Sequence, residues 1–123
     1  MAELADITNA ALGIADIESA AIFVPAPGGV GLALAAAAGI QGPPLDGLVT
    51  AVQNPMHPVA RAMTDDGPTF DVRPMNPGGP ALRAHLPLGG AGVLAVAYNV
   101  PLDAEARAAL TNLAATASTR LRA

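Results

Sequence analysis

The sequence predicts an α+β domain in which helices pack on an antiparallel five-stranded sheet. One observation is the C-terminal third, where two apolar strands joined by a glycine turn lead into a long amphipathic helix. The other is the spacing of Gly, Pro and Asn-Pro breaks in the rest of the chain, which separates segments of helix length from segments of strand length. No internal repeat or domain linker is visible, so we expect residues 1–123 to form a single domain.

Composition supports a folded domain and excludes several classes of partner. Hydrophobic residues make up 52% of the 123 residues and charged residues only 13%, which argues against disorder. The formal net charge is −4, and all six basic residues are Arg. Because no basic patch with interleaved aromatic residues is present, we expect no nucleic-acid binding.

The sequence predicts no targeting signal and leaves no cysteine chemistry. The longest apolar run, from Val30 to Ile40, has eleven residues, which is too short to span a bilayer. Glu3 and Asp6 stand where a signal peptide would carry cationic residues. The chain has no cysteine, which removes disulfides, thiolate metal sites and cysteine nucleophiles. We therefore expect a cytoplasmic protein with no membrane contact, no metal and no cofactor.

The N-terminal part is expected to form one helix and a β-hairpin. Residues 3–12 place apolar side chains on one helical face. Residues 20–24 are β-branched or aromatic enough for a strand, which Pro25 ends. A Pro-Gly-Gly turn at 27–29 then returns the chain, so residues 30–38 are predicted as the partner strand although their alanines also suit a helix.

The middle of the chain is expected to hold two short helices and one short strand. Residues 45–53 carry apolar side chains at helical spacing, and Asn54-Pro55 ends this helix. Pro58 suits the first turn of a second, shorter helix. An Asp-Gly-Pro turn precedes a strand at 69–72, and residues 73–80 contain three Pro and two Gly, which predicts a loop.

The C-terminal third contains the best-defined elements. Residues 81–88 alternate apolar side chains with others, residues 89–92 form a glycine turn, and residues 93–98 are a nearly continuous apolar run. Asp103 is a favourable N-cap for a helix that ends at Leu121. An acidic first turn and arginines in the last turn match the dipole of this helix.

Four segments in this order resemble parts of a GAF domain, a small sensor module related in architecture to PAS domains. They are residues 20–24 with the hairpin that follows, residues 57–68, residues 84–88 and residues 92–105. The resemblance covers nearly the whole chain, and its motifs are hydrophobic patterns with turns, which are specific for a fold. It implies an α+β fold with a GAF-like antiparallel five-stranded sheet, the N- and C-terminal helices on one face and short helices or loops on the other.

The resemblance also implies a non-catalytic sensory or regulatory module that binds a small-molecule ligand or mediates dimerisation. The family's free methionine sulfoxide reductases and covalent bilin carriers depend on cysteine, which this chain lacks. The chain is shorter than usual between Ile40 and Met56 and around residues 73–80, regions that build much of the ligand pocket in the family. A structural or protein-interaction domain with a closed, ligand-free pocket is therefore the alternative.

Two further readings are weaker. A small hydrolase or isomerase would use His57 or His85 as its base, but no residue pattern supplies the partner that orients such a base. A Roadblock-type fold also sandwiches a five-stranded sheet between helices. It requires one long central helix, which Asn54-Pro55 and Pro58 interrupt in this chain.

The candidate ligand-binding residues lie on the predicted short helix and on two strands. His57 precedes Pro58 at a helix start, where it either caps the helix or contacts an anion. Arg83 and His85 share one strand face and form a small polar site if that face is the pocket side. Asp71 can pair with Arg73 or Arg83, or lie exposed. The predicted ligand-binding set is His57, Arg61, Asp71, Arg83 and His85.

The terminal helices are the expected dimer interface. The apolar stripe of the last helix is rich in alanine, so another helix can approach it closely. The first helix is short for covering this stripe, which favours a second copy of the chain as its partner. The predicted homodimer interface consists of Leu4, Ile7, Leu110, Leu113, Ala117 and Leu121.

Overall fold

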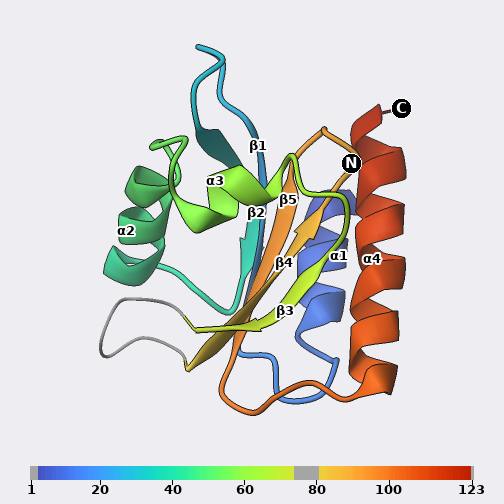
Figure 1. Ribbon diagram of the computed structural model, residues 1–123. Helices are drawn as coiled ribbons and strands as arrows, with labels where there is room; N and C mark the ends of the chain where they lie inside the picture. The colour runs from blue at the N-terminus through green and yellow to red at the C-terminus, as the bar shows by residue number, and fades with distance from the viewer. Residues whose placement is uncertain (1–2, 74–80, 123) are drawn as a thin grey trace.

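The computed structural model describes residues 3–73 and 81–122, which form four helices and five strands (Figure 1). In chain order these are α1 (Glu3–Ala11), β1 (Ser19–Pro25), β2 (Leu32–Ala38), α2 (Pro43–Ala51), α3 (Pro58–Ala62), β3 (Thr69–Val72), β4 (Leu82–Pro87), β5 (Val93–Tyr98) and α4 (Ala104–Arg122). This order of elements confirms the prediction. Apart from Arg73, the predicted loop at 73–80 lies outside the described residues.

The strands form one antiparallel sheet in the order β2-β1-β5-β4-β3. The predicted adjacency of β4 and β5 is confirmed, and in the centre of the sheet Leu94 lies opposite Ile22 on one side and Leu86 on the other. Every residue of β5 is buried, because both faces of this central strand are covered. That is why its sequence is an apolar run without alternation.

The helices cover the two faces of the sheet in pairs, as Figure 1 shows. On one face α1 and α4 lie side by side over the core that contains Ile22, Leu94 and Tyr98. On the other face α2 and α3 pack over Phe23 and Val93. The expected α+β arrangement, with the terminal helices on one face and the short helices on the other, is confirmed.

The start of α4 and its packing follow the sequence pattern. The Asp103 side chain accepts a hydrogen bond from the backbone N–H of Ala106 at 2.8 Å, which is the predicted N-cap. Further along the helix, the Ser118 hydroxyl donates to the carbonyl oxygen of Leu88 at 3.1 Å. Small side chains at Ala114 and Ala117 allow α4 to lie close to its neighbours in the core.

Three residues of the predicted dimer interface are part of the chain's own core. Leu110 and Ala117 are 0% exposed and Ile7 is 5% exposed, packed between the terminal helices and the sheet. They are therefore not available to a second copy while the domain is folded. Leu4, Leu113 and Leu121 are partly buried at the edge of this core.

Candidate functional site

Three of the predicted ligand-binding residues come together on the sheet face covered by α2 and α3. Arg83 and His85 lie two positions apart on β4, opposite Ala97 and Ala95 of β5. Ala95 belongs to the core beneath α2 and α3, so the side chains of Arg83 and His85 lie on that face. The third residue is His57, at the start of α3, which packs on β4 and β5. We call His57, Arg83 and His85 the basic cluster.

His57 caps α3, which was one of its two predicted roles. Its backbone is extended, Pro58 occupies the first turn, and its Nδ1 accepts a hydrogen bond from the backbone N–H of Val59 at 3.2 Å. Partial burial lowers the pKa of His57, and the charge of Arg83 lowers it further. The capping role therefore fixes the position of this imidazole beside Arg83.

His85 is the most deeply buried member of the basic cluster. It is 5% exposed, and its Nε2 is buried with no hydrogen-bond partner among the described residues. Burial lowers the pKa of His85 to about 4, with further lowering by Arg83 and His57 and an opposing effect from Asp65. The imidazole is therefore neutral at pH 7, with one polar nitrogen unpaired in the protein interior.

Arg83 carries the positive charge of the cluster. Its side chain is half-buried, and this burial lowers its pKa from the usual value. Within residues 3–73 and 81–122 it forms no ion pair, since the one ion pair found there joins Arg107 to Asp71. The guanidinium remains charged at neutral pH because its pKa starts far above 7.

Asp71 takes part in a different set of contacts, which tie β3 to β5 and α4. The Tyr98 hydroxyl accepts a hydrogen bond from the Asp71 backbone N–H at 2.7 Å and donates to Asp71 Oδ1 at 2.8 Å. The Leu102 N–H also donates to Oδ1, and Arg107 Nη2 pairs with Oδ2 at 2.6 Å. The ion-pair partner of Asp71 is thus Arg107. The sequence had suggested Arg73 or Arg83 instead.

A bulge in β3 places Asp71 in this position. Thr69 pairs with His85 and Val72 with Arg83, so two residues of β3 lie opposite the single Ala84 of β4. Asp71 adopts a left-handed backbone conformation, with φ of 56°, which Asp tolerates better than most residues. Burial raises the pKa of Asp71, but the hydrogen bonds from Tyr98, Leu102 and Arg107 outweigh this effect and leave the pKa below its usual value.

Three solved structures that this chain resembles in fold are GAF domains. The second GAF domain of DevS from Mycobacterium smegmatis superposes with a TM-score of 0.69, at 21% identity, over 98% of this chain and 91% of that one. A structure of the GAF-B domain of the same protein gives 0.69 at 22% identity, covering 98% and 90%. The GAF domain of an Acinetobacter phosphoenolpyruvate-protein phosphotransferase gives 0.72 at 15% identity, covering 94% and 78%.

The chain has the GAF-domain fold. The resemblance found in the sequence is confirmed at the level of the fold, although no family model and no curated protein matches the sequence itself. Within this GAF fold, the basic cluster lies on the sheet face opposite the terminal helices.

Arg61 lies apart from the basic cluster in the GAF fold. It is exposed on α3 and lines an open hollow of about 430 Å³ between α3 and the tip of the β1–β2 hairpin. Val30, Met63 and Asp65 also line this hollow, whereas His57, Arg83 and His85 do not. The structure therefore joins three of the five predicted ligand-binding residues and separates Arg61 and Asp71 from them.

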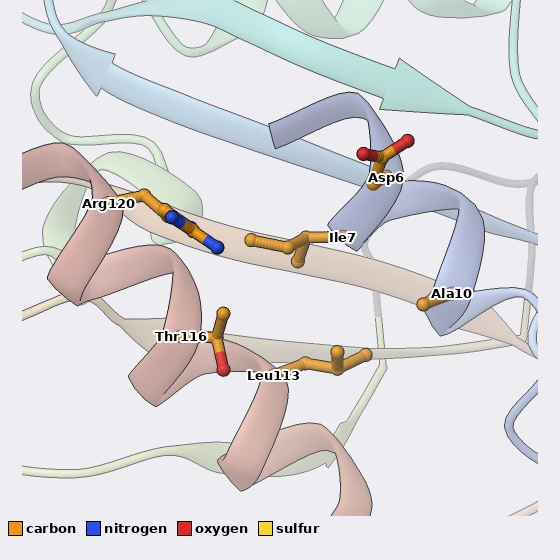
Figure 2. Close-up of a pocket in the computed structure, with 6 residues that line it drawn as sticks. All are labelled: Asp6, Ile7, Ala10, Leu113, Thr116 and Arg120. Atoms are coloured by element: carbon orange, nitrogen blue, oxygen red, sulfur yellow. The ribbon is translucent and has the colours of Figure 1, made fainter. Parts of the chain in front are cut away.

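A second hollow lies between the terminal helices of the GAF fold, and Figure 2 shows its lining. It measures about 160 Å³ and is lined by Asp6, Ile7 and Ala10 of α1 and by Leu113, Thr116 and Arg120 of α4. The Arg120 side chain extends from α4 toward Ile7. This hollow opens on the outer surface of the helix pair, away from the basic cluster.

Among residues 3–73 and 81–122, no group of three or more His, Cys, Asp and Glu side chains is placed to hold a metal ion. None of the helices described there is both long and apolar enough to cross a membrane.

Tyr98 and Arg107 are the structurally important residues that the sequence reasoning missed. Tyr98 stood in an apolar run, and Arg107 lay on the polar side of the predicted helix. Arg107 also lies over the ring of Phe70, 5.1 Å from its centre. The available signal was a tyrosine at the end of an apolar run. Such a tyrosine is usually buried, and a buried tyrosine hydroxyl usually finds a hydrogen-bond partner.

Proposed function

We propose that this GAF-fold chain is a regulatory module that binds a small molecule at the basic cluster and does not transform it. The observation that carries the proposal is the buried, unpartnered Nε2 of His85. Leaving such a group unpaired costs about 1–3 kcal/mol, which a ligand with a matching polar atom recovers. GAF domains as the structural neighbours support the regulatory part of the proposal.

The arrangement of the cluster favours binding over catalysis. His57 already uses Nδ1 to cap α3, so this nitrogen does not take protons from a substrate. His85 has a pKa of about 4, well below the range that suits a general base at neutral pH. No carboxylate among the described residues hydrogen-bonds to either imidazole, so neither base has the orienting partner that catalysis needs.

The alternative function is an interaction domain with a closed pocket, and one observation favours it. Phe23, Val52 and Val59 are 0% exposed in the core between the sheet, α2 and α3. A well-filled core on this face leaves less room for a ligand. Under this alternative His85 is a core residue whose Nε2 stays unpaired.

Native mass spectrometry of the purified protein, compared with its His85→Leu variant, tests the two functions. We expect the wild-type protein to retain a small molecule that the variant loses. The variant lacks the unpaired nitrogen that would bind the ligand, and its leucine fills a similar volume with apolar atoms. The matched control is Arg61→Gln, which changes an exposed residue away from the cluster. A wild-type protein with no retained mass, and with no response to a chemically diverse ligand library, would favour the closed domain.

We also propose that a second copy of the chain packs on the outer surface of α1 and α4. This proposal is supported by the partly exposed side chains of Leu4, Leu113 and Leu121 and by the hollow beside Leu113. Asp6 and Arg120 line the same hollow and carry opposite charges. Two copies related by a two-fold axis can therefore pair apolar with apolar and acid with base across the interface.

A further inference from the structure

We infer that the basic cluster binds a small anion, a carboxylate or a phosphate group, held between Arg83 and His85. This inference rests on the proposed function and adds the chemical class of the ligand. It is carried by the placement of two basic side chains on one sheet face with a third on the helix that covers it, and by the absence of an ion-pair partner for Arg83 among the described residues.

One strand and one helix bring the three side chains of the basic cluster together. Arg83 and His85 project from the same face of β4, each opposite a small alanine of β5. The α3 helix packs over these two strands and brings its capping residue, His57, to the same region. The charge of Arg83 lowers the pKa of both imidazoles, and His57 also lowers the pKa of His85, as expected for groups that lie close together.

The positive charge of Arg83 has no ion-pair partner among the described residues, 3–73 and 81–122. Residues 74–80, which follow β3 in the sequence, contain no Asp or Glu and so have no side-chain carboxylate to offer. Asp71 is occupied by Arg107 and Tyr98, and Asp65, whose charge acts on His85, is exposed. A half-buried guanidinium without a counter-ion favours an anionic ligand.

The hydrogen-bonding groups of Arg83 and His85 also suit an oxyanion. The planar guanidinium of arginine can donate two parallel hydrogen bonds to a carboxylate or a phosphate. The unpaired Nε2 of His85 can carry a proton and donate a further bond to the same oxyanion. A neutral ligand can satisfy Nε2, but it leaves the charge of Arg83 unmatched.

Proton uptake should accompany binding. The groups that face His85 are Arg83 on its own strand, His57 of α3 and Asp65 just after α3. Burial is the main reason that the imidazole is neutral, and the charges of Arg83 and His57 add to this effect. An anion beside His85 favours the protonated imidazole and raises its pKa. The affinity for the anion should therefore increase as the pH falls through the raised pKa of His85 toward its ligand-free pKa of about 4.

The test is an NMR titration of the full chain with inorganic phosphate, with acetate and with neutral acetamide. We expect phosphate or acetate to shift the His85 imidazole signals and to raise the pKa of His85 by about one unit or more. Acetamide should do neither. The anion that binds with the higher affinity assigns the ligand to the phosphate or to the carboxylate class.

Two arginine variants provide the matched comparison. Arg83→Gln should weaken anion binding by about tenfold or more, because it removes charge-assisted hydrogen bonds. Arg61→Gln changes the net charge by the same amount at an exposed position outside the basic cluster, and it should leave the affinity unchanged. Backbone amide spectra of both variants confirm that each remains folded.

Different results overturn the anionic class of the ligand and the ligand-binding function itself. Acetamide binding as well as acetate, or anion binding that Arg83→Gln does not weaken, overturns the anionic class. A neutral molecule retained by the purified protein and lost in His85→Leu also overturns it, and leaves the ligand-binding module standing. A chain that retains nothing and binds neither these probes nor any library compound overturns both.

Discussion

The buried imidazole of His85 has an unusually low pKa, which makes the stability of the chain depend on pH. Its pKa is about 4 in the folded chain, against an ordinary value of 6.5, chiefly because the charged form is costly to bury. Between these two values the unfolded chain binds a proton that the folded chain does not. The stability due to neutral His85 is therefore complete above pH 6.5, and it is lost as the pH falls toward 4.

We expect this loss to appear in urea denaturation of the ligand-free protein at pH 7 and at pH 4. The free energy of unfolding should fall by about 3 kcal/mol more in the wild-type chain than in His85→Leu, because only the wild-type chain gains that proton on unfolding. Equal losses in the two proteins would contradict the low pKa of His85.

The same substitution should stabilise the ligand-free protein at pH 7. His85→Leu removes an unpaired buried nitrogen and keeps most of the side-chain volume, so we expect a gain of about 1 kcal/mol in the free energy of unfolding. Thermal unfolding measures this gain as a rise in Tm. A fall in Tm would mean that His85 contributes packing or a hydrogen bond that leucine does not replace.

At the scale of elements, the edge strand β3 is held in place by side chains as well as by its pairing with β4. Its bulge turns Asp71 toward Tyr98 of β5 and Arg107 of α4. The same strand pairs Thr69 with His85 and Val72 with Arg83. One short strand therefore contacts both the basic cluster and the first turns of the terminal helix.

We expect Tyr98→Phe to cost about 1–3 kcal/mol of stability, because it leaves the backbone N–H of Asp71 and its carboxylate without their buried partner. Arg107→Gln is the comparison variant. It removes a partly exposed ion pair and should cost about 1 kcal/mol or less. Chemical denaturation gives both values, and a Tyr98→Phe variant no less stable than Arg107→Gln would contradict this order.

At the scale of the whole molecule, the two proposed sites lie on opposite sides of the sheet. The face under α2 and α3 contains the basic cluster, while α1 and α4 present the proposed dimer surface to solvent. α4 packs on the sheet and on α1 along its apolar stripe, so only the margin of the stripe is left for a partner. The proposed dimer surface is therefore smaller than the sequence indicated.

The dimer prediction is tested by sedimentation velocity across a range of protein concentrations. We expect the wild-type chain to dimerise and Leu113→Arg to remain a monomer, because the arginine places a charge at the partly exposed centre of the surface. Met56→Arg is the control, since Met56 is 69% exposed and lies outside the terminal helices. A wild-type monomer at high concentration would contradict the prediction.

The sequence by itself determined the order and type of the elements and the resemblance to GAF domains. This was possible because the information is local: Pro and Gly breaks, apolar periodicity and the Asp103 cap act over a few residues. Strand alternation also placed Arg83 and His85 on one face of β4.

Only the tertiary structure decided which neighbours these residues have. The bulge in β3 sends Asp71 to Arg107, 36 positions away, where local spacing suggested Arg73 or Arg83. The packing of α1 and the sheet against α4 buries Leu110 and Ala117, which the helical pattern alone left open to a second chain. Partners and burial depend on contacts between distant segments, and those contacts are set by how the whole chain packs.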